Sequence, residues 1–126
     1  MPHKRVLIID DEEHIREIAI LSFELAEWEV ASAPTGREGA AVALSVPVDV
    51  ILLDVMMPEL DGPGTLALLE ADERTRSIPV IFLTAKVQAT DKRRYLELGV
   101  HGVIAKPFDP LTLPCQVEAI LKGAVV

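Results

Sequence analysis

The sequence predicts a doubly wound α/β domain, in which five parallel strands form a sheet that helices cover on both faces. Three observations support this prediction. Short apolar runs alternate with segments of helical periodicity. The strongest runs are apolar throughout, as in strands that are buried on both faces. Glycine, proline and polar residues separate the segments. Right-handed crossovers then place the helices above and below the sheet, which gives a three-layer sandwich.

The first half of the chain begins with two strand and helix pairs. Residues 6–9 form an unbroken apolar run that carboxylates close, which predicts the first strand. Apolar residues then recur at helical spacing after an acidic first turn, so we expect a helix over about 11–27. Residues 29–33 predict a weaker second strand, and an alanine-rich helix is expected over 37–44.

The alternation continues through the third and fourth strands. Residues 48–53 predict the third strand, and a loop that contains proline and glycine leads to a helix near 66–71. A fourth strand is expected over 79–83. The next helix is expected over 90–98, where Gly99 occupies a C-terminal glycine position and ends it.

The last strand and helix complete the pattern. Residues 102–105 predict the fifth strand. Asp109 and Pro110 suit an N-cap and a first helical position, so we expect the final helix to begin there. Pro114 then falls within the early part of the helix, where it lacks an N–H for the helical ladder. Cys115 is the only cysteine, which excludes an internal disulfide, and its apolar segment predicts a buried thiol.

Length and composition indicate one domain. The 126 residues suit a single compact unit, which we expect to extend over 1–126 with a core of about 4–122. The net charge of -8 argues against nucleic acid as a direct partner. No apolar run is long enough to span a membrane, and the N-terminus lacks a signal-peptide core. We therefore expect a cytoplasmic protein that makes no membrane contact.

Five polar residues stand at strand ends that the topology brings to one edge of the sheet. Asp10 and Asp11 end the first strand, and Asp54 ends the third. Thr84 ends the fourth strand, and Lys106 follows the fifth. In doubly wound sheets, ligands bind beyond the carboxyl ends of the strands. If the strand order is 2-1-3-4-5, the strands that carry these residues are neighbours, and the side chains converge on one crevice.

The crowded carboxylates indicate a metal ion and a phosphoryl group. Such carboxylates repel one another unless a cation neutralises them, and Mg2+ prefers oxygen ligands, including those of phosphate. Asp10, Asp11 and Asp54 are therefore the expected Mg2+ ligands, and the backbone carbonyl of Met56 is a further candidate. Asp54 is the expected nucleophile, because a carboxylate can accept a phosphoryl group as an acyl phosphate. We expect its side chain to face solvent at the strand end.

Lys106 and Thr84 complete the predicted site. The ammonium group of Lys106 can neutralise the oxygens that are transferred, and the hydroxyl of Thr84 can donate to one of them and so sense the phosphoryl group. Each residue taken singly has a simpler explanation. Lys106 could be a solvated lysine, Thr84 could merely end a strand, and Asp11 could be a helix N-cap. Complementary chemistry at four separate strand ends favours the functional interpretation.

Four motifs resemble those of the receiver domains of two-component response regulators. They lie at residues 6–12, 54–62, 84–85 and 106–108, and the resemblance covers the whole chain. It implies a flavodoxin-like sandwich with strand order 2-1-3-4-5 and a Mg2+-dependent switch. It also implies transfer of a phosphoryl group to Asp54 from a phosphohistidine of a sensor histidine kinase or phosphotransfer protein, followed by self-catalysed hydrolysis. Such a protein is a signalling switch rather than a conventional enzyme.

The resemblance also bears on how the switch operates. It implies a cis bond between Lys106 and Pro107 and a conformational change across the fourth helix, fifth strand and fifth helix. Val103 stands where many receivers carry Tyr or Phe, so the usual ring switch is absent. Pro114 would bend a surface that receivers often use for dimerisation, so we expect a monomer or a weak homodimer that depends on phosphorylation. Output is expected through an unidentified downstream protein, unless the chain is one piece of a longer protein.

Three alternative functions stay open. A receiver-like module could dock on a partner without phosphorylation. A flavodoxin-like electron carrier would share the architecture, but the acidic residues 10–13 would repel its phosphate. An aspartate-dependent phosphatase of the haloacid dehalogenase type would carry its nucleophile after the first strand, whereas the better nucleophile here follows the third.

Overall fold

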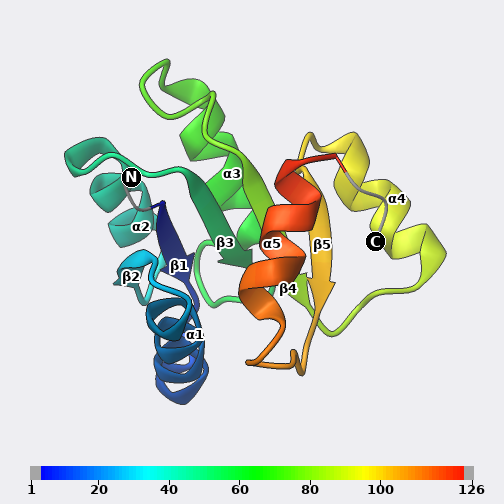
Figure 1. The fold of residues 1–126 in the computed structure, drawn as a ribbon. Helices are drawn as coiled ribbons and strands as arrows, with labels where there is room; N and C mark the ends of the chain where they lie inside the picture. Colours follow the sequence, from blue (N-terminus) through cyan, green and yellow to red (C-terminus); the bar gives the residue numbers. More distant parts are fainter. Residues whose placement is uncertain (1–3, 124–126) are drawn as a thin grey trace.

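The computed structural model describes residues 4–123, and a five-stranded parallel sheet runs through its centre with helices on both faces (Figure 1). The strands are β1 (Arg5–Ile9), β2 (Glu29–Ala33), β3 (Val50–Asp54), β4 (Val80–Thr84) and β5 (Gly102–Ala105). The helices are α1 (Glu13–Leu25), α2 (Gly36–Ser45), α3 (Gly62–Ala71), α4 (Ala89–Glu97) and α5 (Leu113–Leu121). The order β2-β1-β3-β4-β5 confirms the predicted fold class. The predicted domain limits at residues 1 and 126 lie outside the described residues.

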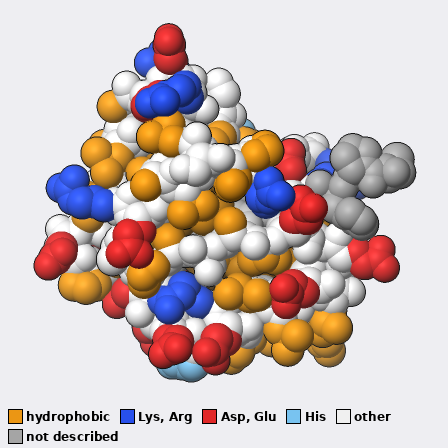
Figure 2. Space-filling view, turned by 90° about the vertical axis from the view of Figure 1, so that its left-hand side faces the viewer, with side chains coloured by type: hydrophobic (Ala, Val, Ile, Leu, Met, Phe, Trp, Pro, Cys, Tyr) orange, Lys and Arg blue, Asp and Glu red, His pale blue; other side chains and the backbone are white. Residues whose placement is uncertain are grey.

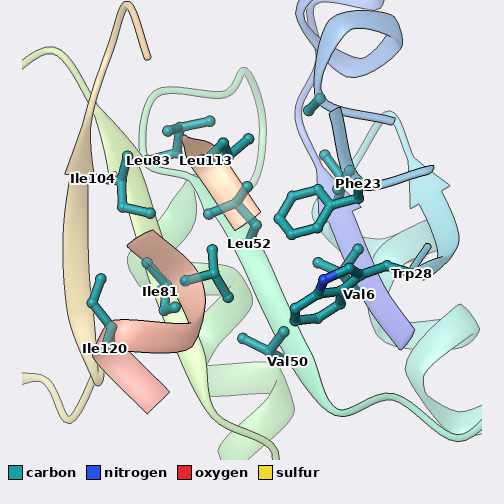
Figure 3. Packing of buried hydrophobic residues seen from close by; sticks show 13 residues of the cluster. Val6, Phe23, Trp28, Val50, Leu52, Ile81, Leu83, Ile104, Leu113 and Ile120 are labelled. Carbon is teal, nitrogen blue, oxygen red and sulfur yellow. The ribbon is translucent and has the colours of Figure 1, made fainter. Parts of the chain in front are cut away.

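The alternation of side chains along the strands divides the core into two layers. On β1, Val6 and Ile8 pack with residues of α1 and α5, whereas Leu7 and Ile9 pack with residues of α2, α3 and α4. Every residue of β3 and β4 is buried, which explains the unbroken apolar runs in the sequence. Figure 3 shows the layer beneath α1 and α5, in which Phe23 and Trp28 pack edge to face with ring centroids 5.0 Å apart.

Helix α3 begins earlier than the sequence predicted. It starts at Gly62 rather than near residue 66, because the side chain of Asp61 accepts a hydrogen bond of 2.8 Å from the N–H of Gly64. A side-chain oxygen at this position satisfies one of the free N–H groups of the first turn. The loop that borders the end of β3 therefore covers residues 55–61 and ends at the N-cap of the helix.

Helix α5 begins later than predicted, so Pro114, which was expected in the early part of this helix, lies at its very start. The side chain of Asp109 accepts a hydrogen bond of 2.9 Å from the N–H of Leu111 and forms a turn rather than an N-cap. The helix starts at Leu113, so Pro114 falls in its first turn, where an N–H has no helical partner in any case. Cys115 is exposed rather than buried, because it lies on the outer side of this helix.

The described surface carries charges of both signs. Figure 2 shows the side of the molecule that is on the left in Figure 1, where Lys and Arg side chains lie among Asp and Glu side chains around exposed apolar groups. No continuous basic patch is visible on this face. None of the helices within residues 4–123 has both the length and the hydropathy needed to cross a bilayer.

Gly39 provides a test of the packing between α2 and β1. A Cβ atom at this position would lie 2.3 Å from Cδ1 of Ile9, which is fully buried. Helix propensity alone predicts that Gly39→Ala stabilises the protein by about 0.5 to 1 kcal/mol. We expect the contact to dominate, so that the substitution lowers the free energy of unfolding by about 1 to 3 kcal/mol in urea denaturation.

Two further variants isolate the cause of this effect. Ile9→Val removes Cδ1, so the double variant should lose less stability than the sum of the two single changes. Ala41→Gly, at an exposed position of α2, reports helix propensity without the contact. A stabilised Gly39→Ala protein would contradict the close packing.

Candidate functional site

The register of β1 and β3 places Asp10 and Asp54 side by side. Ile9 pairs with Leu53, and each aspartate is the next residue along its strand. By the alternation of strand side chains, both carboxylates lie on the side of α1 and α5. Asp10 is 0% exposed and Asp54 is 2% exposed, so the prediction that Asp54 faces solvent is wrong. Its strand end is covered by the contacts described next.

Lys106 lies between the buried carboxylates. Its Nζ atom is 2.8 Å from Oδ2 of Asp10 and 3.2 Å from Oδ1 of Asp54. A third carboxylate oxygen, Oε1 of Glu12, lies 3.6 Å away. The lysine side chain is itself only 15% exposed, so solvent screens these ion pairs weakly. One ammonium group therefore offsets part of the repulsion between the carboxylates.

The peptide bond between Lys106 and Pro107 is cis, as the family resemblance implied. The N–H of Lys106 donates a hydrogen bond of 2.9 Å to the carbonyl oxygen of Thr84. The backbone of the segment after β5 is thus attached to the end of β4. This attachment directs the lysine side chain toward the ends of β1 and β3.

Four carboxylates gather at this edge of the sheet. Asp10, Asp11, Glu12 and Asp54 each offer one oxygen atom, and these atoms all lie within 4.8 Å of one another. Within residues 4–123, the buried Oδ2 atom of Asp54 accepts no hydrogen bond and takes part in no ion pair. A buried oxygen without a partner is costly, and a hard cation would supply one. The cluster therefore fits a divalent cation that prefers oxygen ligands.

The surroundings of Asp54 change its acidity. Burial raises the pKa of this carboxyl group to about 6, and the negative charge of Asp10 adds to the effect. The positive charge of Lys106 lowers the same pKa but does not cancel the increase. For Lys106, burial acts to lower the pKa, but the attraction of Asp10 and Asp54 outweighs it and raises the pKa above its usual value. Lys106 therefore stays charged throughout the neutral range.

Thr84 lies next to the carboxylates but on the other side of the sheet. It is 1% exposed, and by strand alternation its side chain points toward the layer that contains α3 and α4. Its Oγ1 atom accepts a hydrogen bond of 3.1 Å from the N–H of Lys86. Within the described residues, no hydrogen bond joins its hydroxyl group to the acidic cluster. The role of Thr84 as a phosphoryl sensor stays a prediction.

The loop after β3 holds Met56 beside Asp54. The N–H of Met56 donates to Oδ1 of Asp54 over 3.3 Å, and the Met56 side chain is 63% exposed. The loop returns on itself through a hydrogen bond of 2.9 Å from the N–H of Gly62 to the carbonyl of Val55. A Cβ atom on Gly62 would lie 2.8 Å from the Cα atom of Val55, so this close approach requires glycine. The carbonyl of Met56 as a metal ligand stays a prediction.

Two hydrogen bonds fix the segment between β1 and α1. The N–H of Glu12 donates to Oδ1 of Asp10 over 2.9 Å, and Nη1 of Arg16 donates to the carbonyl oxygen of Asp10 over 2.7 Å. The N-cap of α1 is Glu12 rather than Asp11, and its side chain accepts no capping bond. Neither Glu12 nor Arg16 belonged to the predicted site. From the sequence alone, both residues look like ordinary charged residues of an amphipathic helix. The one sequence feature that could have indicated Glu12 as part of the acidic cluster is its position directly after Asp11.

The core layer against which Val103 packs contains two aromatic rings, and both come from other elements. Val103 pairs with Phe82 of β4 and is partly buried in the same core layer as Tyr95 of α4. The rings of Phe82 and Tyr95 pack edge to face with centroids 5.3 Å apart. Tyr95 therefore fills space in this layer from the helix rather than from β5.

Comparison with known proteins identifies relatives along most of the chain. A family model described as "Response regulator receiver domain" matches residues 6–118. The DNA-binding dual master transcriptional regulator RpaA of Synechocystis sp. is 38% identical over 118 residues, which are 94% of this chain and 49% of that protein. The phosphate regulon transcriptional regulatory protein PhoB of Pseudomonas aeruginosa is 38% identical over 122 residues, or 97% of this chain and 53% of that protein. The chain spans about half the length of these curated relatives.

Solved structures are similar over nearly their full length. The chemotaxis response regulator CheY4 of Vibrio cholerae superposes with a TM-score of 0.88 at 29% identity, and the match covers 94% of this chain and 99% of that chain. A putative response regulator from Chloroflexus aurantiacus superposes with a TM-score of 0.86 at 29% identity and covers 96% and 99%. The likeness therefore extends over nearly the whole of this domain.

The raised pKa of Asp54 predicts a pH-dependent gain in stability for Asp54→Asn. Because the folded protein binds this proton more tightly than the unfolded chain, ionisation of Asp54 costs stability as the pH rises from the usual pKa of 3.8 to about 6. Without divalent cations, Asp54→Asn should be more stable than the wild type by about 1 to 3 kcal/mol near pH 7.5, with little difference near pH 4.

Urea denaturation at both pH values measures this gain. Glu70→Gln, an exposed change on α3 that removes the same charge, serves as the control. An Asp54→Asn protein that is less stable than the wild type near pH 7.5 would contradict the raised pKa.

Proposed function

Because the chain belongs to the response regulator receiver domain family, we propose that it is a phosphorylation-driven switch in which Asp54 accepts a phosphoryl group. The observation that carries this proposal is the position of Lys106, whose Nζ lies 3.2 Å from Oδ1 of Asp54, inside a cluster of four carboxylates. Family membership supports the class of reaction, and the cluster supports the residues assigned to it.

The acidic cluster is proposed to hold Mg2+. Asp10, Asp11 and Asp54 would be the side-chain ligands, with the backbone carbonyl of Met56 as a further one. The unpartnered Oδ2 atom of Asp54 and the oxygen chemistry of the cluster support this assignment. When bound, the ion would neutralise the carboxylates and the oxygens of the incoming phosphoryl group.

The residues of the chain then have distinct roles in the transfer. Above its pKa of about 6 the Asp54 carboxylate is ionised and can attack the phosphorus atom of a phosphohistidine. A P–O bond forms as the P–N bond breaks, and the histidine nitrogen leaves. The ammonium of Lys106 stabilises the negative charge on the transferred oxygens. Later attack by water on the phosphorus atom would break the P–O bond to Asp54, release inorganic phosphate and regenerate the carboxylate.

The structure suggests how Thr84 could transmit the signal. Its hydroxyl group accepts a hydrogen bond from the N–H of Lys86, which lies in the loop before α4. If the Thr84 side chain rotates to bring its hydroxyl to a phosphoryl oxygen, its oxygen atom moves away from the N–H of Lys86, and the loop loses this contact. Tyr95, which packs on Phe82, would carry the change into α4 in place of a ring at Val103.

Partners follow from the same proposal. The phosphoryl donor would be a sensor histidine kinase or a phosphotransfer protein, and the output would pass to a downstream protein. The relatives named as transcriptional regulators are about twice as long as this chain. The net charge of -8 disfavours direct contact with nucleic acid. A cytoplasmic location and a monomer or weak phosphorylation-dependent homodimer complete the proposal.

Phosphorylation by a small donor tests the nucleophile directly. With acetyl phosphate and Mg2+, the wild type should gain the mass of one phosphoryl group in mass spectrometry, and Asp54→Asn should gain none. Asp61→Asn is the matched control, because asparagine also caps helix α3 and the same acid-to-amide change is made nearby. A phosphorylated Asp54→Asn protein would refute the assignment, and an unreactive wild type would favour a docking module that needs no phosphorylation.

Amide NMR tests the role of Thr84. In the wild type, beryllofluoride, a stable phosphoryl mimic, should shift the resonances of Lys86 and α4. Thr84→Ala should still bind the mimic and shift the resonances of Asp54 and Met56, but the shifts in α4 should be largely lost. Thr84→Ser, which keeps the hydroxyl group, should retain them. Equal shifts in α4 for the wild type and Thr84→Ala would contradict this role.

A further inference from the structure

Arg16 of α1 contacts the backbone of the proposed metal-binding segment rather than a carboxylate. Its Nη1 atom donates a hydrogen bond of 2.7 Å to the carbonyl oxygen of Asp10. Within residues 4–123 its guanidinium group forms no ion pair, although acidic residues surround it in the sequence. The contact spans six residues and reaches back over the first turn of the helix. The Arg16 side chain therefore acts as a long hydrogen-bond donor to the backbone rather than as the partner of an acidic side chain.

The carbonyl group of Asp10 needs such a partner. Asp10 is fully buried, and β1 ends one residue earlier, at Ile9. The N–H of Asp10 still bonds to the carbonyl of Ala33 in β2, over 3.2 Å. Buried carbonyl oxygens are almost always paired, and a hydrogen bond from a charged donor is among the stronger ones available. Arg16 therefore completes the hydrogen bonding of the strand end.

The same contact orients the next residue. The carbonyl oxygen of Asp10 and the N–H of Asp11 belong to one planar peptide unit, so holding the oxygen restricts rotation of the whole unit. This sets the direction in which the Asp11 side chain leaves the backbone. Asp11 is exposed, and within the described residues its carboxylate accepts no hydrogen bond of its own. Its placement in the cluster therefore depends on the backbone.

We propose that Arg16 is a positioning residue, which holds the peptide between Asp10 and Asp11 so that both carboxylates converge with Asp54 on a divalent cation. This inference rests on the proposed function, because it takes these aspartates as Mg2+ ligands. Arg16 contacts neither the ion nor the phosphoryl group. As a positive charge near the cluster it also repels a cation, so its charge and its positioning act on Mg2+ affinity in opposite directions.

Because loss of the charge and loss of the positioning contact change Mg2+ affinity in opposite directions, a substitution at Arg16 tests the proposal. Arg16→Met keeps the aliphatic stem and removes both the charge and the donors. Loss of positioning should raise the Mg2+ dissociation constant about tenfold in titration calorimetry, as is usual when the support of a ligand is removed. Loss of charge alone should lower the constant. Arg93→Met, an exposed change of the same charge on α4, should leave it unchanged within about twofold. Asp11→Asn, which removes a proposed ligand, gives the reference for a damaged site.

Kinetics separate positioning from a general structural defect. With acetyl phosphate, Arg16→Met should need more Mg2+ to reach half of its maximal phosphorylation rate, while the maximal rate stays close to that of the wild type. Thermal unfolding without metal establishes that the variant is folded. If Arg16→Met does not fold, Arg16→Gln, which keeps a polar end but is too short to reach the carbonyl, should show the same weakening.

The outcomes distinguish this inference from the proposed function. A wild type that binds no Mg2+ would refute both. A wild type that binds Mg2+, together with a folded Arg16 variant that binds it equally well or more tightly, would overturn only the role of Arg16. A lower maximal rate that excess Mg2+ does not restore would also overturn it, because that result places Arg16 in the transfer step.

Discussion

The ion pairs of Lys106 with Asp10 and Asp54 are the interaction on which this site depends. Two carboxylates that are almost fully buried lie at adjacent strand ends, where their repulsion would oppose folding. The ammonium group stands 2.8 Å and 3.2 Å from them and offsets part of that repulsion, but burial, together with the charge of Asp10, still raises the pKa of Asp54 to about 6. The site thus holds one ammonium group among four carboxylates, so its negative charge is only partly neutralised. This remaining negative charge suits a protein that is proposed to bind a divalent cation and to accept a phosphoryl group.

The residues of the predicted site lie on both faces of the sheet. Asp10, Asp54 and Lys106 lie on the side of α1 and α5, where their contacts join three strand ends. Thr84 ends β4 toward the opposite layer, and its hydroxyl group is bonded to the loop before α4. The edge-to-face packing of Tyr95 on Phe82 links α4 to β4 on this second face.

Much of this architecture could be predicted because burial on both faces leaves a plain pattern in the sequence. Unbroken apolar runs predicted the strands, and carboxylates directly after two of them predicted which residues would meet. The strand order came from the resemblance of four motifs to a known family. Predictions near α5 were less successful, because Asp109 can serve either as a turn residue or as an N-cap. Only its bond to the N–H of Leu111 decides between them. Cys115 is exposed because the buried side of this helix is formed by Leu113, Val117 and Ile120.

The sequence by itself determined the fold class and the identities of the acidic residues, the lysine and the threonine at the strand ends, because these depend on local hydrophobic pattern and on position along each strand. Tertiary structure alone decided that Asp54 is buried, that Glu12 joins the carboxylates and that Arg16 reaches the carbonyl oxygen of Asp10. Burial and side-chain reach depend on which loops cover a strand end and at what distance. These are properties of the packed chain in three dimensions, and no spacing along the sequence encodes them.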